Sequence, residues 1–190
     1  MRGFLKTDAF VIGQKELGEK DKIITLLTEN NGKIKVFARG IRSVKSRRMG
    51  SLQTGNKIEA SLSRKDDQFY LGEIELLQSY ENIKKSLVLN AGLLSICELV
   101  NNLLAENEEN MEAYQLFSET IDDLASKSGV EIIVIFEVKL LQILGYGIPE
   151  KIDKLLIERN WPEAQKEVGR YLEVVCERKI NGMKIFLSND

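Results

Sequence analysis

Histidine is absent from this 190-residue sequence, and cysteine occurs only twice. Without histidine, the chain has no imidazole for a Ser-His-Asp triad or for a histidine-ligated zinc ion. Two cysteines are also too few for a four-thiolate zinc site. Cys97 and Cys176 lie far apart, on the apolar faces of expected helices, so we expect buried free thiols in a reducing compartment. The composition therefore predicts a protein without a metal ion or other cofactor.

Long apolar runs are missing too. The longest run, Ile132 to Phe136, is far too short to span a bilayer. The N-terminus lacks an apolar region of the length that a secretory signal needs. These two features predict a cytoplasmic protein that has no membrane partner.

The sequence also lacks the motifs of common enzyme classes. It has no G-x-x-x-x-G-K-[ST] phosphate loop, no dinucleotide-binding fingerprint and no G-x-S-x-G turn. The nearest approach to paired carboxylates is Asp66 with Asp67 at an expected turn, and Glu73 with Glu75 on one face of an expected strand. A solvated surface is the favoured interpretation of the second pair, and a two-metal nuclease would need a carboxylate cluster drawn from several elements, an alternative that stays open. The sequence therefore gives no positive signal for catalysis, and we predict that the protein is not an enzyme.

Negative charge is missing from one long stretch, because no Asp or Glu occurs between residues 30 and 58. The chain is net acidic, yet residues 1–80 hold 15 Lys and Arg against 10 Asp and Glu, and residues 81–190 hold 12 against 19. A patch of one sign favours an anionic partner, and nucleic-acid phosphates are the usual one. The expected phosphate contacts are the seven cations between Gly32 and Arg48: Lys33, Lys35, Arg39, Arg42, Lys45, Arg47 and Arg48.

The first half of this basic stretch alternates like a half-buried strand. Ile34, Val36 and Ala38 share one face, and Lys33, Lys35, Phe37 and Arg39 share the other. An exposed Phe37 beside cations offers a surface on which a base could stack, although an ordinary packed strand aromatic fits the pattern equally well. After Gly40 the alternation ends in a basic loop.

Five short strands are expected in the first eighty residues, at 9–14, 23–28, 33–39, 57–63 and 69–77. Asn31-Gly32 is the strongest turn signal between them, and Asp66-Asp67 marks another hairpin tip. Short strands joined by hairpins favour a small barrel over a doubly wound sheet. We therefore predict a five-stranded OB-fold barrel for residues 1–79, a fold that often reads nucleic acid.

From about Tyr80 the apolar period changes from two to between three and four, which predicts a helical bundle for residues 80–190 and an α+β protein as a whole. The segment Val130 to Leu144 is apolar in eleven of fifteen positions. Its β-branched start favours a strand, but its length, its later helix formers and the Gly145 stop favour a helix more strongly. Pro162 fits the first turn of another helix. A short strand or ordered tail is expected at 183–187.

Several ordered motifs resemble one bacterial family. The run GEKDKIITLLTENNGKIKVFARGIRSVKS, from Gly18 to Ser46, closely resembles the N-terminal domain of the recombination mediator RecO. Gly50-Ser51-Leu52-Gln53 matches the G-x-L-Q segment of that family, and Glu73 to Leu77 is similar to the end of its barrel. More loosely, Phe136 to Pro149 is similar to its core helix and the loop that follows.

The resemblance implies an N-terminal OB-fold, a C-terminal helical domain and no need for ATP. It implies binding to single- and double-stranded DNA, annealing of complementary strands, and partnership with RecR and with the acidic C-terminal tail of the single-stranded-DNA-binding protein SSB, so that RecA loads during recombinational repair. Many members carry a four-cysteine zinc site after the loop that corresponds to Tyr146–Pro149. This chain has no cysteine there, so zinc binding is not carried over. Thr54 stands where the family often has proline, and 190 residues is short for the family.

Two other functions fit the same residues. The barrel could be an RNA-binding or ribosome-associated module, because OB domains serve both polymers. The basic loop could also belong to a protein-interaction adaptor that captures an acidic peptide tail. For all three functions the expected oligomeric state is a monomer.

Overall fold

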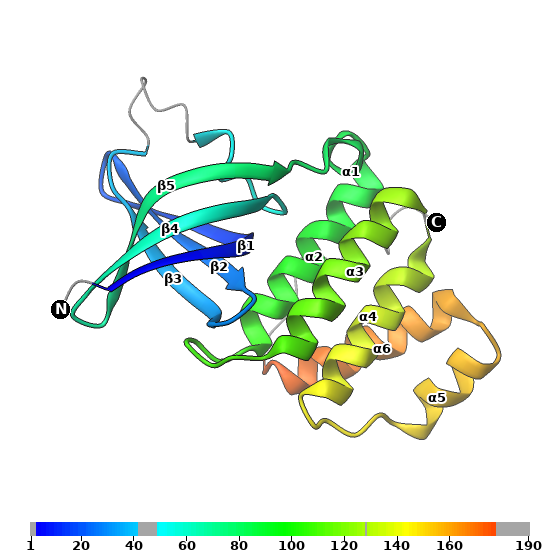
Figure 1. The fold of residues 1–190 in the computed structure, drawn as a ribbon. Helices are drawn as coiled ribbons and strands as arrows, with labels where there is room; N and C mark the ends of the chain where they lie inside the picture. The colour runs from blue at the N-terminus through cyan, green and yellow to red at the C-terminus, as the bar shows by residue number, and fades with distance from the viewer. Residues whose placement is uncertain (1–2, 42–48, 128, 178–190) are drawn as a thin grey trace. The chain divides into compact units, whose positions relative to one another are not determined.

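The computed structural model describes residues 3–41, 49–127 and 129–177, and the chain forms two compact units. The first unit runs up to Tyr80 and also contains the segment from Leu104 to Tyr114. The second unit contains Glu81 to Leu103 and the residues from Gln115 onward. The first is built of strands and the second of helices (Figure 1). The division into domains at residues 79 and 80 stays a prediction, and the structure adds that Leu104–Tyr114 belongs with the strands.

The first unit is a closed barrel of five strands in the order β1-β2-β3-β5-β4. All neighbouring pairs are antiparallel except β3 with β5, which are parallel. This topology is that of an OB-fold, so the predicted fold class and all five predicted strands are confirmed. The strands are β1 (Gly3–Leu17), β2 (Asp21–Thr28), β3 (Gly32–Ala38), β4 (Lys57–Lys65) and β5 (Gln68–Gln78).

β1 closes the barrel because it pairs with two strands along its length. Its first half pairs with β4 and its second half with β2, and the register shifts between Val11 and Gly13. Such a bulge bends a strand and increases its twist. A single fifteen-residue strand therefore turns from one neighbour to the other without ending.

The barrel interior is filled by the inward-facing half of each strand. Ile34, Val36 and Ala38 of β3 are buried there, as the alternation predicts. Ile24 and Leu26 of β2 join the same apolar core. Burying an aliphatic side chain of this size stabilises the fold by roughly 1.5–3 kcal/mol. The apolar face of β3 is therefore held in the core, and only the opposite face is available to contact a ligand.

The segment Leu104–Tyr114 packs against the barrel beside the start of β3. A backbone bridge joins Glu106 to Lys33 in parallel, and the Asn107 N–H donates a 2.8 Å hydrogen bond to the Lys33 carbonyl. Tyr114 lies against Phe10 of β1, with ring centroids 5.8 Å apart. This segment therefore covers part of the outer surface of β3.

Six helices make up the described part of the region after the barrel. Phe117 and Phe136 meet edge to face, with ring centroids 6.4 Å apart, and both are fully buried. Within this unit, α4 packs against α2 and α6. The helices are α1 (Glu81–Lys85), α2 (Leu87–Leu103), α3 (Met111–Ser126), α4 (Val130–Ile143), α5 (Glu150–Ile157) and α6 (Trp161–Val175).

The helix predictions are confirmed where the structure describes the chain. The ambiguous segment after Val130 is helical, and α4 ends just before Gly145. Pro162 lies in the first turn of α6, whose N-cap Asn160 accepts a hydrogen bond from the Glu163 N–H. The short helix α1 was not predicted. The strand or tail expected at 183–187 lies outside the described residues.

The two cysteines are both free thiols. Cys97 of α2 is buried, as predicted, and burial raises the pKa of its thiol to about 12. Cys176 at the end of α6 is only half-buried, which corrects the expectation of a fully buried residue. Across the residues that the structure describes, every helix is too short or too polar to cross a membrane.

Candidate nucleic-acid interface

The outward face of β3 carries three of the residues predicted to bind nucleic acid. Lys35 and Arg39 are exposed, and Phe37 between them is half-buried. Because β3 and β5 run parallel, with Phe37 opposite Tyr70, the two rings lie together with centroids 5.6 Å apart. The Arg39 guanidinium lies over the Tyr70 ring, 4.8 Å from its centroid. We call Phe37, Arg39 and Tyr70 the aromatic patch.

The aromatic patch combines the two kinds of contact that single-stranded nucleic acids require. The rings give base-stacking surface, and the guanidinium gives a positive charge for phosphate. An arginine held over a ring gains roughly 0.5–1 kcal/mol at an exposed site. This contact restricts the Arg39 side chain before any ligand arrives, so less side-chain freedom is lost on binding.

Lys33 is placed differently from the other predicted cations. Only 5% of its surface is exposed, because the backbone of Leu104–Tyr114 pairs with β3 at this position. The Lys33 side chain is therefore not open to a ligand, unlike those of Lys35 and Arg39, which disagrees with its predicted role as a phosphate contact. Lys35, one alternation further along β3, remains exposed and forms an ion pair with Glu106 of the same covering segment.

Arg42, Lys45, Arg47 and Arg48 lie outside the described residues. The chain that leads into this basic loop is fixed to the barrel at Gly40 and Ile41. Gly40 adopts a positive φ of 62°, and its N–H donates a 2.7 Å hydrogen bond to the Asp21 carboxylate. Ile41 is buried in the barrel core. The loop therefore starts from a fixed point directly after Arg39 of the aromatic patch.

The chain that leaves the basic loop is fixed as well. Leu52 is buried in the barrel core. The buried Asn56 side chain donates hydrogen bonds to the carbonyls of Gly50, at 3.2 Å, and Ser51, at 2.9 Å. These contacts give a physical reason for the Gly50–Gln53 motif. Its leucine is buried in the core, and its first two carbonyls accept the hydrogen bonds that hold the turn. Both ends of the basic loop are thus held by the barrel.

The carboxylates that could suggest catalysis are dispersed on the barrel surface. Asp66 and Asp67 sit at the tip of the β4–β5 hairpin, and Glu73 and Glu75 are exposed along β5. Asp67 forms a 3.2 Å ion pair with Arg64. Within the described ranges, no three His, Cys, Asp or Glu side chains gather in a way that could hold a metal ion.

Sequence reasoning missed three residues that shape the site, namely Tyr70, Asp21 and Glu106. Tyr70 could have been found by applying the OB-fold pairing of the third and fifth strands to the predicted elements. The sequence around Asp21 and Glu106 does not predict their roles, because each contacts a residue that is distant in the chain, Gly40 and Lys35 respectively.

Comparison with protein families identifies both halves of the chain. Residues 1–80 match the family model described as "Recombination protein O N terminal". Residues 84–151 match "Recombination protein O C terminal". The chain belongs to the RecO family. The N-terminal RecO match contains the whole barrel, including the aromatic patch, and the C-terminal RecO match extends from α1 to the start of α5.

Curated relatives carry the same family name. The chain is 33% identical over 142 residues to the DNA repair protein RecO of Dehalococcoides mccartyi, a match that covers 74% of this chain and 56% of that protein. It is 30% identical over 146 residues to the DNA repair protein RecO of Acetivibrio thermocellus (76% and 58%). It is 31% identical over 145 residues to that of Caldanaerobacter subterraneus (75% and 59%). The matched part of this RecO-family chain thus spans somewhat more than half the length of these relatives.

Proposed function

We propose that this RecO-family chain binds single- and double-stranded DNA during DNA repair and anneals complementary strands without ATP. In this role it is a binding protein and not an enzyme, and it helps a recombinase to load on DNA coated by SSB. The proposal is carried by the aromatic patch on β3 and β5. Arg39 of this patch immediately precedes Gly40, where the chain is held to the barrel before the basic loop begins.

The proposed contacts divide into two groups by chemistry. Lys35, Arg39 and the loop cations Arg42, Lys45, Arg47 and Arg48 neutralise phosphates and release condensed counterions. Phe37 and Tyr70 stack on unpaired bases, at roughly 1–3 kcal/mol for each stacked base. Lys33 is left out of the proposed site because it is buried.

Annealing requires no acid or base from the protein. Two phosphate backbones repel each other, and a positive surface that neutralises both lets complementary bases meet. Phosphate contacts carry no sequence information, so any pair of complementary strands is a substrate. Stacking on the aromatic patch favours unpaired bases, which are lost once the duplex forms. The product therefore binds less well than the separate strands, which allows its release.

The proposed protein partners are RecR and the acidic tail of SSB. The same excess of cations that suits phosphate also suits an acidic peptide. The aromatic patch favours nucleic acid as the main ligand, because it offers stacking surface that an acidic tail does not require. Peptide and DNA would then compete for the basic loop.

A charge-reversal experiment tests the proposal. The triple variant Arg42→Glu, Lys45→Glu, Arg47→Glu is expected to abolish strand annealing while its thermal unfolding matches that of the unmodified protein. The matched control reverses three exposed cations of the helical unit, Lys139, Lys154 and Lys166. It changes the net charge by the same amount and is expected to anneal normally. Normal annealing by the loop variant would contradict the proposed site, and a clear preference for RNA over DNA of equal sequence would point to an RNA-binding module instead.

A further inference from the structure

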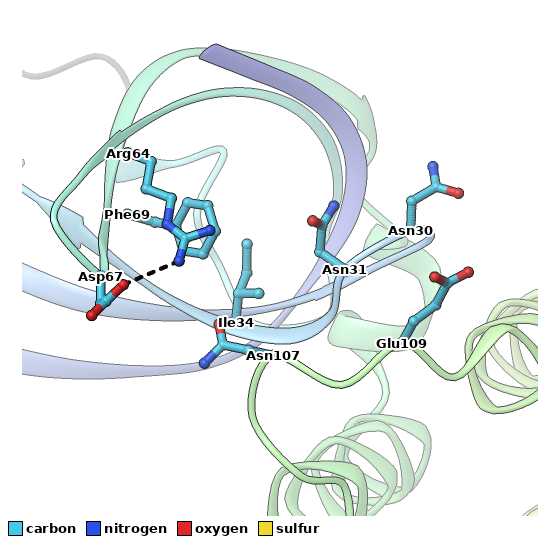
Figure 2. A pocket seen from close by; sticks show the side chains of 8 residues that line it. All are labelled: Asn30, Asn31, Ile34, Arg64, Asp67, Phe69, Asn107 and Glu109. Carbon is cyan, nitrogen blue, oxygen red and sulfur yellow. Dashed lines mark hydrogen bonds and ion pairs between the residues drawn. The ribbon is translucent and has the colours of Figure 1, made fainter. Parts of the chain in front are cut away.

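A hollow of about 470 Å³ opens at one end of the barrel, at some distance along β3 from the basic loop. Its walls come from three segments of the barrel unit: the β2–β3 turn, the β4–β5 hairpin and Leu104–Tyr114 (Figure 2). Ile34 and Phe69 form an apolar floor, and the remaining lining side chains are polar. The volume lies in the range of small-molecule sites, which is about 300–1,000 Å³.

Three carboxamides line this hollow, from Asn30, Asn31 and Asn107. Their side chains make no hydrogen bond to any other residue that the structure describes, although the backbone at two of the three positions is held in place. The Asn31 N–H donates to the Thr28 hydroxyl at 3.1 Å, and the Asn107 N–H donates to the Lys33 carbonyl. Each carboxamide offers two donors and one acceptor. The hollow thus presents paired donors and acceptors on a fixed backbone.

A flat cation lies at the opposite wall. The Arg64 guanidinium lies over the Phe69 ring, 5.6 Å from its centroid, and is also held by the 3.2 Å ion pair to Asp67. Figure 2 shows the guanidinium across the ring and the Asp67 carboxylate beside it. A guanidinium fixed in this way presents a planar surface on which another flat group can stack.

The charges around the hollow disfavour a phosphate as the ligand. Asp67 is paired with Arg64, and Glu109 adds a further negative charge to the lining. A phosphate would meet two carboxylates and one cation that is already paired. A neutral, flat group with donors and acceptors on one edge meets the carboxamides and the guanidinium face without that repulsion. Among common cellular groups, a nucleobase has this chemistry.

We propose that this hollow binds a single nucleobase, which stacks on Arg64 and forms hydrogen bonds with the carboxamides of Asn31 and Asn107. The base comes either from a free nucleoside or from an unpaired position of a bound strand. In the second case the inference rests on the proposed DNA-binding function. Bases in this hollow would be read by their edges, in contrast to the sequence-independent contacts of the basic loop.

The position of Leu104–Tyr114 is what gives the hollow its third wall. Gly32 lets this segment approach the β2–β3 turn closely, because a Cβ atom at Gly32 would overlap the carbonyl oxygen of Glu108. Asn107 itself has a positive φ of 61°, a conformation that asparagine tolerates better than most residues. Gly32 and Asn107 therefore both tolerate the backbone geometry that places this wall and its carboxamide beside the hollow.

The test is titration of the ¹⁵N-labelled chain with deoxyadenosine, deoxyguanosine, deoxycytidine and thymidine, each without phosphate. Saturable shifts of the side-chain amide signals of Asn31 and Asn107 are expected with at least one nucleoside. Asn107→Gly keeps the backbone conformation and is expected to weaken that binding about five-fold, the effect of one net hydrogen bond. Asn31→Ala is expected to weaken it by the same amount. Gln142→Ala, which removes an exposed carboxamide from α4, is expected to have no effect.

A second arm separates the two sources of the base. If the base belongs to a bound strand, Asn107→Gly weakens binding of a single-stranded oligonucleotide and leaves the salt dependence of that binding unchanged. If only free nucleosides enter, oligonucleotide binding is unchanged in the variant. No shift of the Asn31 and Asn107 signals with any nucleoside would overturn the inference. The DNA-binding proposal is tested by a different measurement, the salt dependence of binding, so the failure of one proposal can be distinguished from the failure of the other.

Discussion

Glu137 of α4 provides the sharpest prediction about stability. Its side chain is 2% exposed, and its Oε2 atom has no hydrogen-bond partner within the described residues. Burial raises the pKa of this carboxyl from 4.5 to about 8, because the charged form loses its hydration without gaining a partner. The informative perturbation is Glu137→Gln, which keeps the shape and removes the charge.

The sign of the pH effect follows from the direction of the pKa shift. Below about pH 4.5 the carboxyl is protonated in both the folded and the unfolded chain, so it adds no pH-dependent penalty. As pH rises toward 8, the unfolded chain loses the proton while the folded chain keeps it, and stability falls. At about 1.4 kcal/mol for each pH unit between the two pKa values, the penalty reaches about 3 kcal/mol at pH 7 and at most about 5 kcal/mol above pH 8.

The assay is equilibrium unfolding in urea at pH 5, 7 and 8.5 for the unmodified chain and for Glu137→Gln. The difference in unfolding free energy between the two is expected to grow by several kcal/mol from pH 5 to pH 8.5, in favour of the variant. Glu137→Leu, which also removes the unpaired polar atom, is expected to show the same growth. Stability curves that stay parallel across this pH range for both variants would refute the reasoning.

Three further predictions concern the barrel. Glu106→Gln is expected to strengthen DNA binding by a few-fold at low salt, because it releases Lys35 from its ion pair; equal binding in filter titrations would contradict this. Gly32→Ala is expected to lower the unfolding free energy by more than about 1 kcal/mol, since the new Cβ meets Glu108 at a positive φ; a melting temperature equal to that of the unmodified chain would oppose it. Phe37→Leu is expected to weaken binding of single strands by about 1–3 kcal/mol and to leave duplex binding nearly unchanged, and an equal loss for both forms would show that Phe37 does not stack on bases.

The sequence was informative where structure depends on neighbouring residues. Alternation placed Ile34 and Val36 inside the barrel, and Asn31-Gly32 marked a hairpin, in which Gly32 adopts a positive φ of 59° that glycine tolerates best. The helix after Val130 was identified by its length in spite of its β-branched start. In each case the local preference and the final fold agree.

The parts that sequence reasoning missed depend on contacts between distant segments. Lys33 is buried by a segment about seventy residues further along the chain, which no periodicity reveals. Tyr70 meets Phe37 only because β3 and β5 pair in parallel. Glu137 is different, because it has a local signal: it interrupts a helix that is apolar on nearly every side. A charged residue in such a helix has few exposed positions available to it.

The salt dependence of binding to a fluorescent single-stranded oligonucleotide tests the central claim most directly. The site predicts a log–log slope of about −4, from about −0.7 for each phosphate contact made by Lys35, Arg39 and the four loop cations. Replacing Arg42, Lys45, Arg47 and Arg48 by glutamine is expected to reduce the slope by about 3, while unfolding stays unchanged. A slope that is the same in the unmodified chain and in this variant would contradict the assignment of the basic loop as the DNA site.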